Sequence, residues 1–217
     1  MGLKIRYIGH ACFRIQTDSG MVIVTDPFDE SVPYEFPRLQ ADIVTVSHEH
    51  FDHNAVDRVD GDPEVVRGLG EHAPRGISIW GIPSFHDAKG GRERGRNTIF
   101  RLQVDGVNLV HFGDLGHPLN AEQLKPLRET EVALLPVGGH FTIGPREAAE
   151  LIRALPKLKV VIPMHAKTDV IKDWPIAPVD EFLAAADLPV ERPQGPDVEL
   201  TPEAIPTGKQ VWVLPHA

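Results

Sequence analysis

Short apolar runs separated by turn-forming residues open the sequence. Residues 3–9, 11–17 and 21–27 are such runs, with a polar Asp-Ser-Gly step between the last two. Alternation of this kind is typical of β-strands joined by turns. Residues 41–47 are almost continuously apolar, as expected for a strand buried on both faces. The first part of the chain is therefore predicted to be rich in β-structure.

Further strands are predicted before helical patterns begin. Residues 76–83, 97–106 and 107–114 have strand-like composition, and the "VDGV" step between the last two predicts a tight hairpin. Two later strands are predicted at residues 131–138 and 159–165.

Helical periodicity appears in the second half of the chain. Residues 120–129 follow Asn120, a good N-cap, and residues 144–157 have Pro145 at an early helical position. Residues 178–188 predict one more helix, followed by a final strand at 210–215. The chain is thus predicted to belong to the α/β class.

No linker divides the sequence, and residues 1–217 are predicted to form one domain. Its C-terminal part, from about residue 188, is polar and rich in proline. Such a segment favours extended structure at the surface over a helix. We therefore expect a peripheral arm that closes one sheet.

Composition limits the classes of partner. Of the 217 residues, 41% are hydrophobic, enough for a real core, and the formal net charge of -9 disfavours general binding to nucleic acid or anionic membranes. Cys12 is the only cysteine, which excludes an internal disulfide and a multi-cysteine zinc site. The sequence shows neither a signal peptide nor a run of roughly 18 apolar residues. We expect a cytoplasmic protein without membrane insertion, acting on a small molecule, as a monomer or homo-oligomer.

The segment "SHEHFDH", residues 47–53, concentrates ionisable side chains directly after a buried strand. Alternate residues of an extended segment point the same way, so His48 and His50 can converge on one ion. The following turn directs Asp52 and His53 towards a neighbouring position. A solvated histidine-rich loop is the alternative, but the spacing favours a metal site.

Three further candidates stand at the ends of predicted strands. They are His86, Asp114 and His165, and each follows an apolar run and precedes a loop. Site residues of α/β proteins gather at such strand ends. Together with the histidine cluster they supply more ligands than one tetrahedral ion can use.

Several motifs resemble the metallo-β-lactamase superfamily. "SHEHFDH", "GDLG" and a late "MH" occur in its order, and "IRYIGHACFRI", "VTDPF", "SFHD" and "GGHFTIGPREAA" are similar to its UPF0173 and ascorbate-phosphate-lactonase-like branch. The resemblance extends to about Lys167. It implies a four-layer αββα sandwich with the site at one edge between the two sheets.

The resemblance also implies a ligand assignment. His48, His50 and His86 would hold the first metal. The second would be held by Asp52, His53 and His165. Asp114 would bridge the two ions, and Asp26 would orient the histidine loop without binding an ion.

Two divalent ions about 3.5 to 4 Å apart can share a water, lower its pKa and polarise a substrate oxygen. The predicted protein is therefore a binuclear metal-dependent hydrolase that uses a metal-bridged hydroxide on a small ester, lactone or phosphodiester. Zinc is the first expectation and manganese the second, and the ligand set also suits iron or nickel. The alternatives are a metallo-nuclease acting on RNA or DNA and a non-catalytic metal-binding protein.

The remaining histidines have less defined roles. Asp52, Asp114 and His140 are the candidate catalytic residues; His140 would polarise a substrate oxygen or protonate the leaving group. His10 is a candidate pocket residue and His117 a candidate support for the ligands. For His10 and His140, the alternative is a hydrogen-bonded packing role.

The segment "KGGRERGR", residues 89–96, directly follows the His86 region. Its charges and glycines indicate a mobile loop, and a charged loop of this kind is expected to face water. The alternative is that the loop covers the site, where Arg92, Arg94 and Arg96 could hold a phosphate or carboxylate of the substrate. Cys12 lies in an apolar strand pattern and is predicted to be a buried packing residue.

Overall fold

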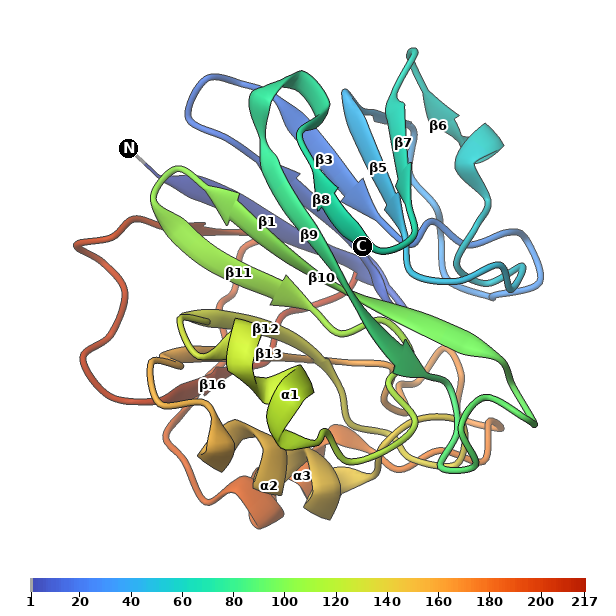
Figure 1. Ribbon diagram of the computed structural model, residues 1–217, viewed down its shortest axis with the longest axis vertical. Coiled ribbons are helices and arrows are strands. Elements are labelled where there is room, and N and C mark those ends of the chain that lie inside the picture. The colour runs from blue at the N-terminus through green and yellow to red at the C-terminus, as the bar shows by residue number, and fades with distance from the viewer. Residues whose placement is uncertain (1) are drawn as a thin grey trace.

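Two β-sheets packed face to face form the centre of the computed structural model, which describes residues 2–217 (Figure 1). The first sheet has six strands in the order β15-β1-β2-β3-β5-β7. These strands are β1 (Leu3–Gly9), β2 (Cys12–Gln16), β3 (Val22–Thr25), β5 (Ile43–Val46), β7 (Glu64–Arg67) and β15 (Asp197–Leu200).

The second sheet has eight strands in the order β14-β16-β13-β12-β11-β10-β9-β8. They are β8 (Gly70–His72), β9 (Ser78–Phe85), β10 (Arg96–Val104), β11 (Val107–His111), β12 (Val132–Pro136), β13 (Val160–Met164), β14 (Val190–Glu191) and β16 (Gln210–Trp212). A separate two-stranded sheet pairs β4 (Leu39–Gln40) with β6 (Val59–Asp60).

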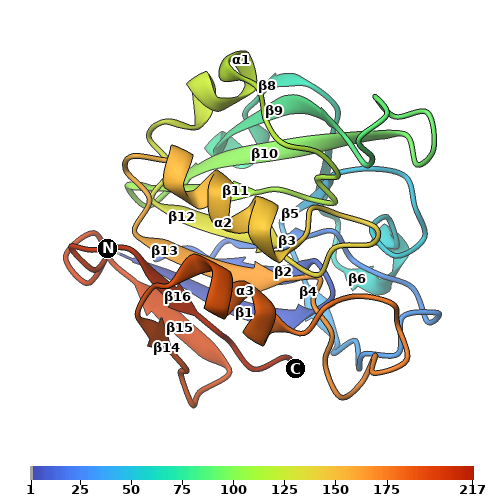
Figure 2. The ribbon, with the colours of Figure 1, turned by 90° about the horizontal axis from the view of Figure 1, so that it is seen from below.

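The α-helices lie together on the outer face of the second sheet (Figure 2). They are α1 (Ala121–Leu124), α2 (Pro145–Ala154) and α3 (Val179–Ala186), accompanied by the 3-10 helices η1 (Val56–Arg58), η2 (Pro74–Gly76) and η3 (Lys125–Leu127). The helix predicted at 120–129 is thus divided: Asn120 caps α1 through Glu122 and Gln123, and η3 continues the chain after Leu124.

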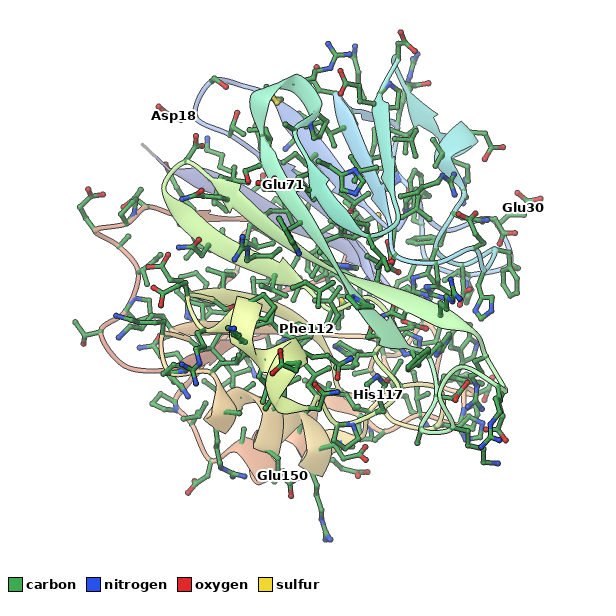
Figure 3. All side chains as sticks on the ribbon, in the orientation of Figure 1. Asp18, Glu30, Glu71, Phe112, His117 and Glu150 are labelled. Carbon is green, nitrogen blue, oxygen red and sulfur yellow. The ribbon has the colours of Figure 1, made fainter. Side chains whose placement is uncertain are left out.

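Side chains that alternate along the strands fill the space between the sheets. On β12, Leu134 packs between the two sheets while Ala133 and Leu135 face α2. Phe112, just after β11, lies in the interior on the helical side (Figure 3). Strands buried on both faces have near-continuous apolar sequences, which is why β5, β11, β12 and β13 were recognisable.

The α/β sandwich expected from the sequence is confirmed, with a difference on one side. The outer face of the first sheet is covered mainly by irregular chain, including Phe28, Val32 and Tyr34, and within residues 2–217 no α-helix packs there. The proline-rich C-terminal segment contributes the strand β15, which pairs with β1 at the edge of the first sheet.

Strands β7 and β8 were not predicted. In β7 only Val66 is buried, and its neighbours Glu64, Val65 and Arg67 are exposed, so an edge strand with little apolar pattern results. Within the described chain, no helix combines the length and apolarity needed to span a bilayer.

Candidate metal centre

Ends of strands from both sheets meet at one edge of the sandwich. The parallel strands β3 and β5 of the first sheet lead to Asp26 and to the 47–53 segment. The parallel strands β11 and β13 of the second lead to Asp114 and His165. Parallel strands end on the same edge, and this shared edge brings residues distant in sequence into one cluster.

The segment that follows β5 presents two imidazoles to one point. His48 Nε2 and His50 Nδ1 lie 3.1 Å apart, and His86, at the end of β9, completes a group whose ligand atoms lie within 4.8 Å of one another. Burial and the facing His53 lower the pKa of His48 to about 3. His48 is therefore neutral at physiological pH, as a metal ligand must be.

Asp26 fixes the orientation of this segment through hydrogen bonds to two of its residues. It is fully buried; Oδ1 accepts from the Ser47 amide at 2.8 Å, and Oδ2 accepts from His53 Nδ1 at 2.8 Å and from the Ser47 hydroxyl. Burial opposes ionisation, but His111 and His53 hold the Asp26 pKa below its ordinary value. Because Nδ1 of His53 is engaged, its Nε2 is free to face the cluster.

Ser47 was not singled out in the sequence. Its hydroxyl donates to Asp26, so it accepts from His48 Nδ1 at 3.0 Å, which leaves Nε2 of His48 free. The sequence feature that could have indicated this role is the serine that opens "SHEHFDH". A serine at the end of a strand has many other functions, however, and only the structure shows that it lies beside Asp26.

Asp114 lies between the imidazole groups of the centre. Its Oδ2 is 3.1 Å from His86 Nε2, 3.3 Å from His53 Nε2 and 3.4 Å from His165 Nε2. Burial opposes ionisation, but His165 and His53 hold the Asp114 pKa well below its ordinary value. One carboxylate thus connects the group around His86 with the group around His165.

The backbone around Asp114 needs glycine on both sides. Gly113 has φ +54°, and a Cβ there would lie 2.3 Å from Asn97 Oδ1; one on Gly116 would lie 2.3 Å from the carbonyl carbon of His86. The buried Asn97 accepts from the Asp114 amide at 2.9 Å. The "GDLG" motif therefore allows the chain to pass close beside its neighbours, and Asn97, another residue missed in the sequence, anchors it.

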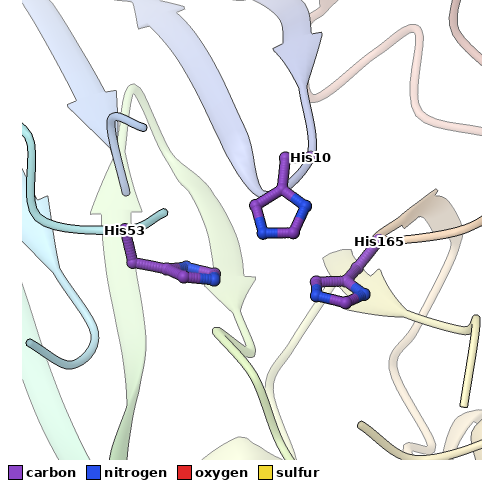
Figure 4. Close-up of side chains that lie close together, drawn as sticks. All are labelled: His10, His53 and His165. Carbon is purple, nitrogen blue, oxygen red and sulfur yellow. The ribbon is translucent and has the colours of Figure 1, made fainter. Parts of the chain in front are cut away.

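His10, His53 and His165 form a second convergent group (Figure 4). The ring centroids of His10 and His165 are 4.3 Å apart, and the His165 amide donates to the His10 carbonyl at 2.9 Å. His10 Nε2 lies 3.1 Å from Asp52 Oδ2, which is 3.7 Å from His53 Nε2. His10 is therefore packed behind Asp52, fully buried.

Three residues of the centre adopt left-handed backbone conformations. The φ angles of His10, Asp26 and His165 are +56°, +39° and +50°. Such conformations are costly for residues with a side chain and concentrate at functional sites. Each occurs where a strand ends and its next side chain must turn towards the shared edge.

The donor set fits divalent metal ions. Within residues 2–217, His53 Nε2 and Asp114 Oδ1 are buried without a hydrogen-bond partner. Unpartnered buried polar atoms are costly. Both of these atoms present a lone pair, so a bound cation is the partner that would satisfy them. Ionised carboxylates and neutral imidazoles such as His48, whose pKa burial and His53 lower to about 3, are the donors that divalent zinc or manganese prefers.

A cavity of about 470 Å³ opens onto the cluster. The ionisable side chains at its base and wall are His50, Asp52, His86, Asp114, His165 and Arg94. Phe51, Phe141, Trp174 and Pro175 form the remainder of the lining. The space suits a small molecule with an apolar part.

The predicted catalytic residue His140 does not join this group. Its side chain is exposed and does not line the cavity; the turn after β12 places the neighbouring Phe141 there instead. Its catalytic role remains a prediction without geometric support. His117 accepts from the Phe85 amide at 3.2 Å, so it supports the chain beside His86 (Figure 3).

The arginine-containing segment after His86 is a closed turn tied to Asp87. The Asp87 carboxylate accepts backbone hydrogen bonds from Lys89, Gly91, Glu93 and Arg94 at 2.7 to 3.0 Å. These bonds hold the Asp87 pKa well below its ordinary value, and the bond from the Arg94 amide has the largest effect. The sequence suggested a mobile loop, but in the structure its glycines form part of this closed turn. Of the three candidate arginines, only Arg94 lines the cavity over the metal centre.

A sandwich of two sheets with imidazoles and carboxylates gathered at one edge defines the metallo-β-lactamase-like class. Residues 4–165 match the family model of the beta-lactamase superfamily domain. A UPF0173 metal-dependent hydrolase of Thermococcus onnurineus is 31% identical over 80% of this chain and 86% of that protein. Another, of Pelotomaculum thermopropionicum, is 31% identical over 85% and 92%.

Solved structures agree with this assignment. A candidate Zn-dependent hydrolase of the metallo-β-lactamase superfamily from Thermotoga maritima is 40% identical, with a TM-score of 0.82 over 98% of both chains. The metallo-hydrolase Igni18 of Ignicoccus hospitalis, 24% identical with a TM-score of 0.66, covers 86% of this chain and 91% of its own, and shares the fold. The chain belongs to the metallo-β-lactamase superfamily and, within it, to the UPF0173 metal-dependent hydrolase family.

Proposed function

We propose that this protein is a binuclear metal-dependent hydrolase that acts on a small ester, lactone or phosphodiester. The observation that carries the proposal is the place of Asp114, whose Oδ2 lies 3.1 Å from His86 and 3.4 Å from His165. A carboxylate between two imidazole groups is suited to bridging two ions. Separate mononuclear sites would not need it.

The proposed ligands fall into two sets. His48, His50 and His86 would hold one ion; His53, His165 and Asp52 would hold the other, with Asp114 common to both. Zinc is the first expectation and manganese the second, with iron and nickel also compatible with these donors. The bound ions supply Lewis acidity towards a substrate oxygen and lower the pKa of water.

Asp52 has both the position and the charge that a ligand of the second ion needs. Its side chain lines the cavity, and Nε2 of the buried His10 lies 3.1 Å from its Oδ2. Burial opposes ionisation of Asp52, but the bond to His10 holds its pKa well below the ordinary value. Its carboxylate is therefore ionised at neutral pH, as a metal ligand must be, and the bond to His10 fixes its orientation.

The cavity needs no protein nucleophile for this chemistry. Cys12 is fully buried and does not line the cavity. Burial, followed by the charge of Asp26, raises the pKa of its thiol well above the ordinary value, so it stays protonated and unreactive. Hydrolysis by an activated water is the reaction that the lining residues support.

The first test is metal content. Protein purified without chelator should contain about two divalent ions per chain by elemental analysis, and activity lost to a chelator should return with zinc or manganese. A reproducible single ion, with no activation by added metal, would overturn the binuclear proposal.

The second test is a substrate panel. Nitrophenyl esters, lactones and bis(nitrophenyl) phosphate should be hydrolysed, with single-stranded RNA and DNA as comparators. The cavity of about 470 Å³ suits the small substrates. Faster turnover of nucleic acid would favour a nuclease, and binding of two ions without turnover of any compound would favour a non-catalytic metal-binding protein.

A further inference from the structure

A second cavity, of about 430 Å³, is lined by the segment from Val46 to His50 beside the metal centre. Its charged lining consists of Arg67, Arg94 and Arg96 with one acid, Glu49. We call it the arginine cavity. His50 and Arg94 line both this cavity and the one over the metal centre, so the two are adjacent.

The charges of the arginine cavity do not balance. Arg67 pairs with Glu49, and this bond holds the Glu49 pKa below its ordinary value. Arg94 and Arg96 form no ion pair with any of residues 2–217. Two guanidinium groups beside one cavity give this part of an otherwise acidic chain, of formal net charge -9, a local positive charge that suits an anionic ligand.

Hydrogen bonds hold the backbone of both arginines before any ligand binds. Arg96 begins strand β10, which pairs with β9, and the amide of Arg94 donates to Asp87 at 2.8 Å. The Arg94 guanidinium lies 5.5 Å from the centroid of the Phe141 ring. A held backbone, and for Arg94 a held guanidinium, reduces the freedom that is lost when an anion binds.

The cavity over the metal centre supplies the other half of a recognition site. Phe51, with 60% of its surface exposed, stands at that cavity with Phe141 and Trp174. Three aromatic rings along one cavity offer an apolar surface that the apolar part of a ligand can cover. The scissile bond would lie over the metals and an apolar body against these rings.

We propose that the arginine cavity is an anion subsite, which binds a carboxylate or phosphate carried by the substrate at a distance from the bond to be cleaved. The substrate class is then an ester or lactone with an apolar body and a remote anionic group. This proposal rests on the proposed function only for the position of the scissile bond.

Arg92 provides a matched control. It belongs to the same turn, but its side chain is exposed, donates to the Lys89 carbonyl at 3.0 Å and lines neither cavity. Arg92→Ala therefore removes the same charge from the same segment without touching the subsite. Arg94→Ala and Arg96→Ala remove it from the subsite.

The turnover experiment uses the zinc-loaded protein and nitrophenyl half-esters of adipic, pimelic and suberic acid, each compared with its methyl-capped diester. For at least one of the three acids, the wild-type protein should hydrolyse the charged half-ester with a higher kcat/KM than its methyl-capped diester. Arg94→Ala and Arg96→Ala should each raise KM for that half-ester about fivefold, with less than about twofold change for the capped partner, since these arginines are partly exposed. Arg92→Ala should change neither.

A binding experiment keeps this proposal separate from the proposed function. Nitroanilides of the same acids, free or methyl-capped, are titrated calorimetrically into the metal-loaded protein, where turnover is not needed. Selective weakening of the free acids by Arg94→Ala and Arg96→Ala supports the subsite even if no ester is hydrolysed. No preference for the free acid in the wild type, equal weakening of both ligands, or the same loss in Arg92→Ala would overturn it.

Discussion

Replacing Asp26 by Asn should weaken the binding of one metal ion selectively while leaving the fold intact. The substitution preserves shape and removes a charge that is fully buried. An amide oxygen can still accept from the Ser47 amide. The amide nitrogen then occupies the place of Oδ2, where it faces His53 Nδ1 across the 2.8 Å that the carboxylate now bridges.

The magnitude follows from the proton on His53. Two donors cannot face each other, so His53 must move its proton from Nδ1 to Nε2, the nitrogen that lies 3.3 Å from Asp114. A protonated nitrogen cannot bind metal. Loss of such a supporting carboxylate typically weakens metal binding by about 10- to 100-fold, equivalent to about 1.4 to 2.7 kcal/mol.

The assay is a competition with a chromophoric chelator, which resolves the two binding steps. In Asp26→Asn the step assigned to His53 and His165 should weaken by that factor, and the step assigned to His50 and His86 should change far less. Ser47→Ala is the complementary variant, since its hydroxyl orients His48. Equal weakening of both steps, or unchanged affinities with a folded protein, would refute the reasoning.

Three further outcomes are expected. Asp114→Asn should lower hydrolysis by more than about 100-fold and reduce metal content, as an amide bridges two cations poorly, and unchanged values would remove Asp114 from the centre. The metal-free protein should lose stability to urea as the pH falls from 6.5 towards 4. His10 and His48, with pKa values lowered to about 4 and about 3, stay neutral in the folded protein and take up protons only when it unfolds. Each contributes a slope of about 1.4 kcal/mol per pH unit, and a flat profile would contradict this. Cys12→Ala should keep the activity and its pH profile, measured with the same nitrophenyl esters, and a loss of activity in the folded variant would contradict the metal-based mechanism.

The sequence alone determined most of the fold because its periodicities were strong. The continuous apolar runs of β5, β12 and β13 and the amphipathic α2 were recognisable from local pattern. The exposed strand β7 was not, because a strand with one buried side chain has almost no pattern to detect. Pairing in the sheets decided its conformation.

The candidate ligands were identifiable from the sequence for a different reason. Histidine and aspartate are expensive to bury, so seven of them at the ends of apolar runs required a common explanation. The supporting residues gave no such signal. Ser47, Asn97 and Asp87 are ordinary polar residues whose roles exist only through the partners that folding brings to them.

The tertiary structure decided which neighbours of the ligands reach the cavity. In "GGHFT" the chemistry of the residues favoured His140, but the turn after β12 exposes it and directs Phe141 inward. Of the arginines in "KGGRERGR", the turn closed on Asp87 leaves Arg92 in solvent and places Arg94 between the two cavities. Local sequence specifies which side chains are available, but the direction of a side chain on a turn depends on backbone angles set by distant contacts.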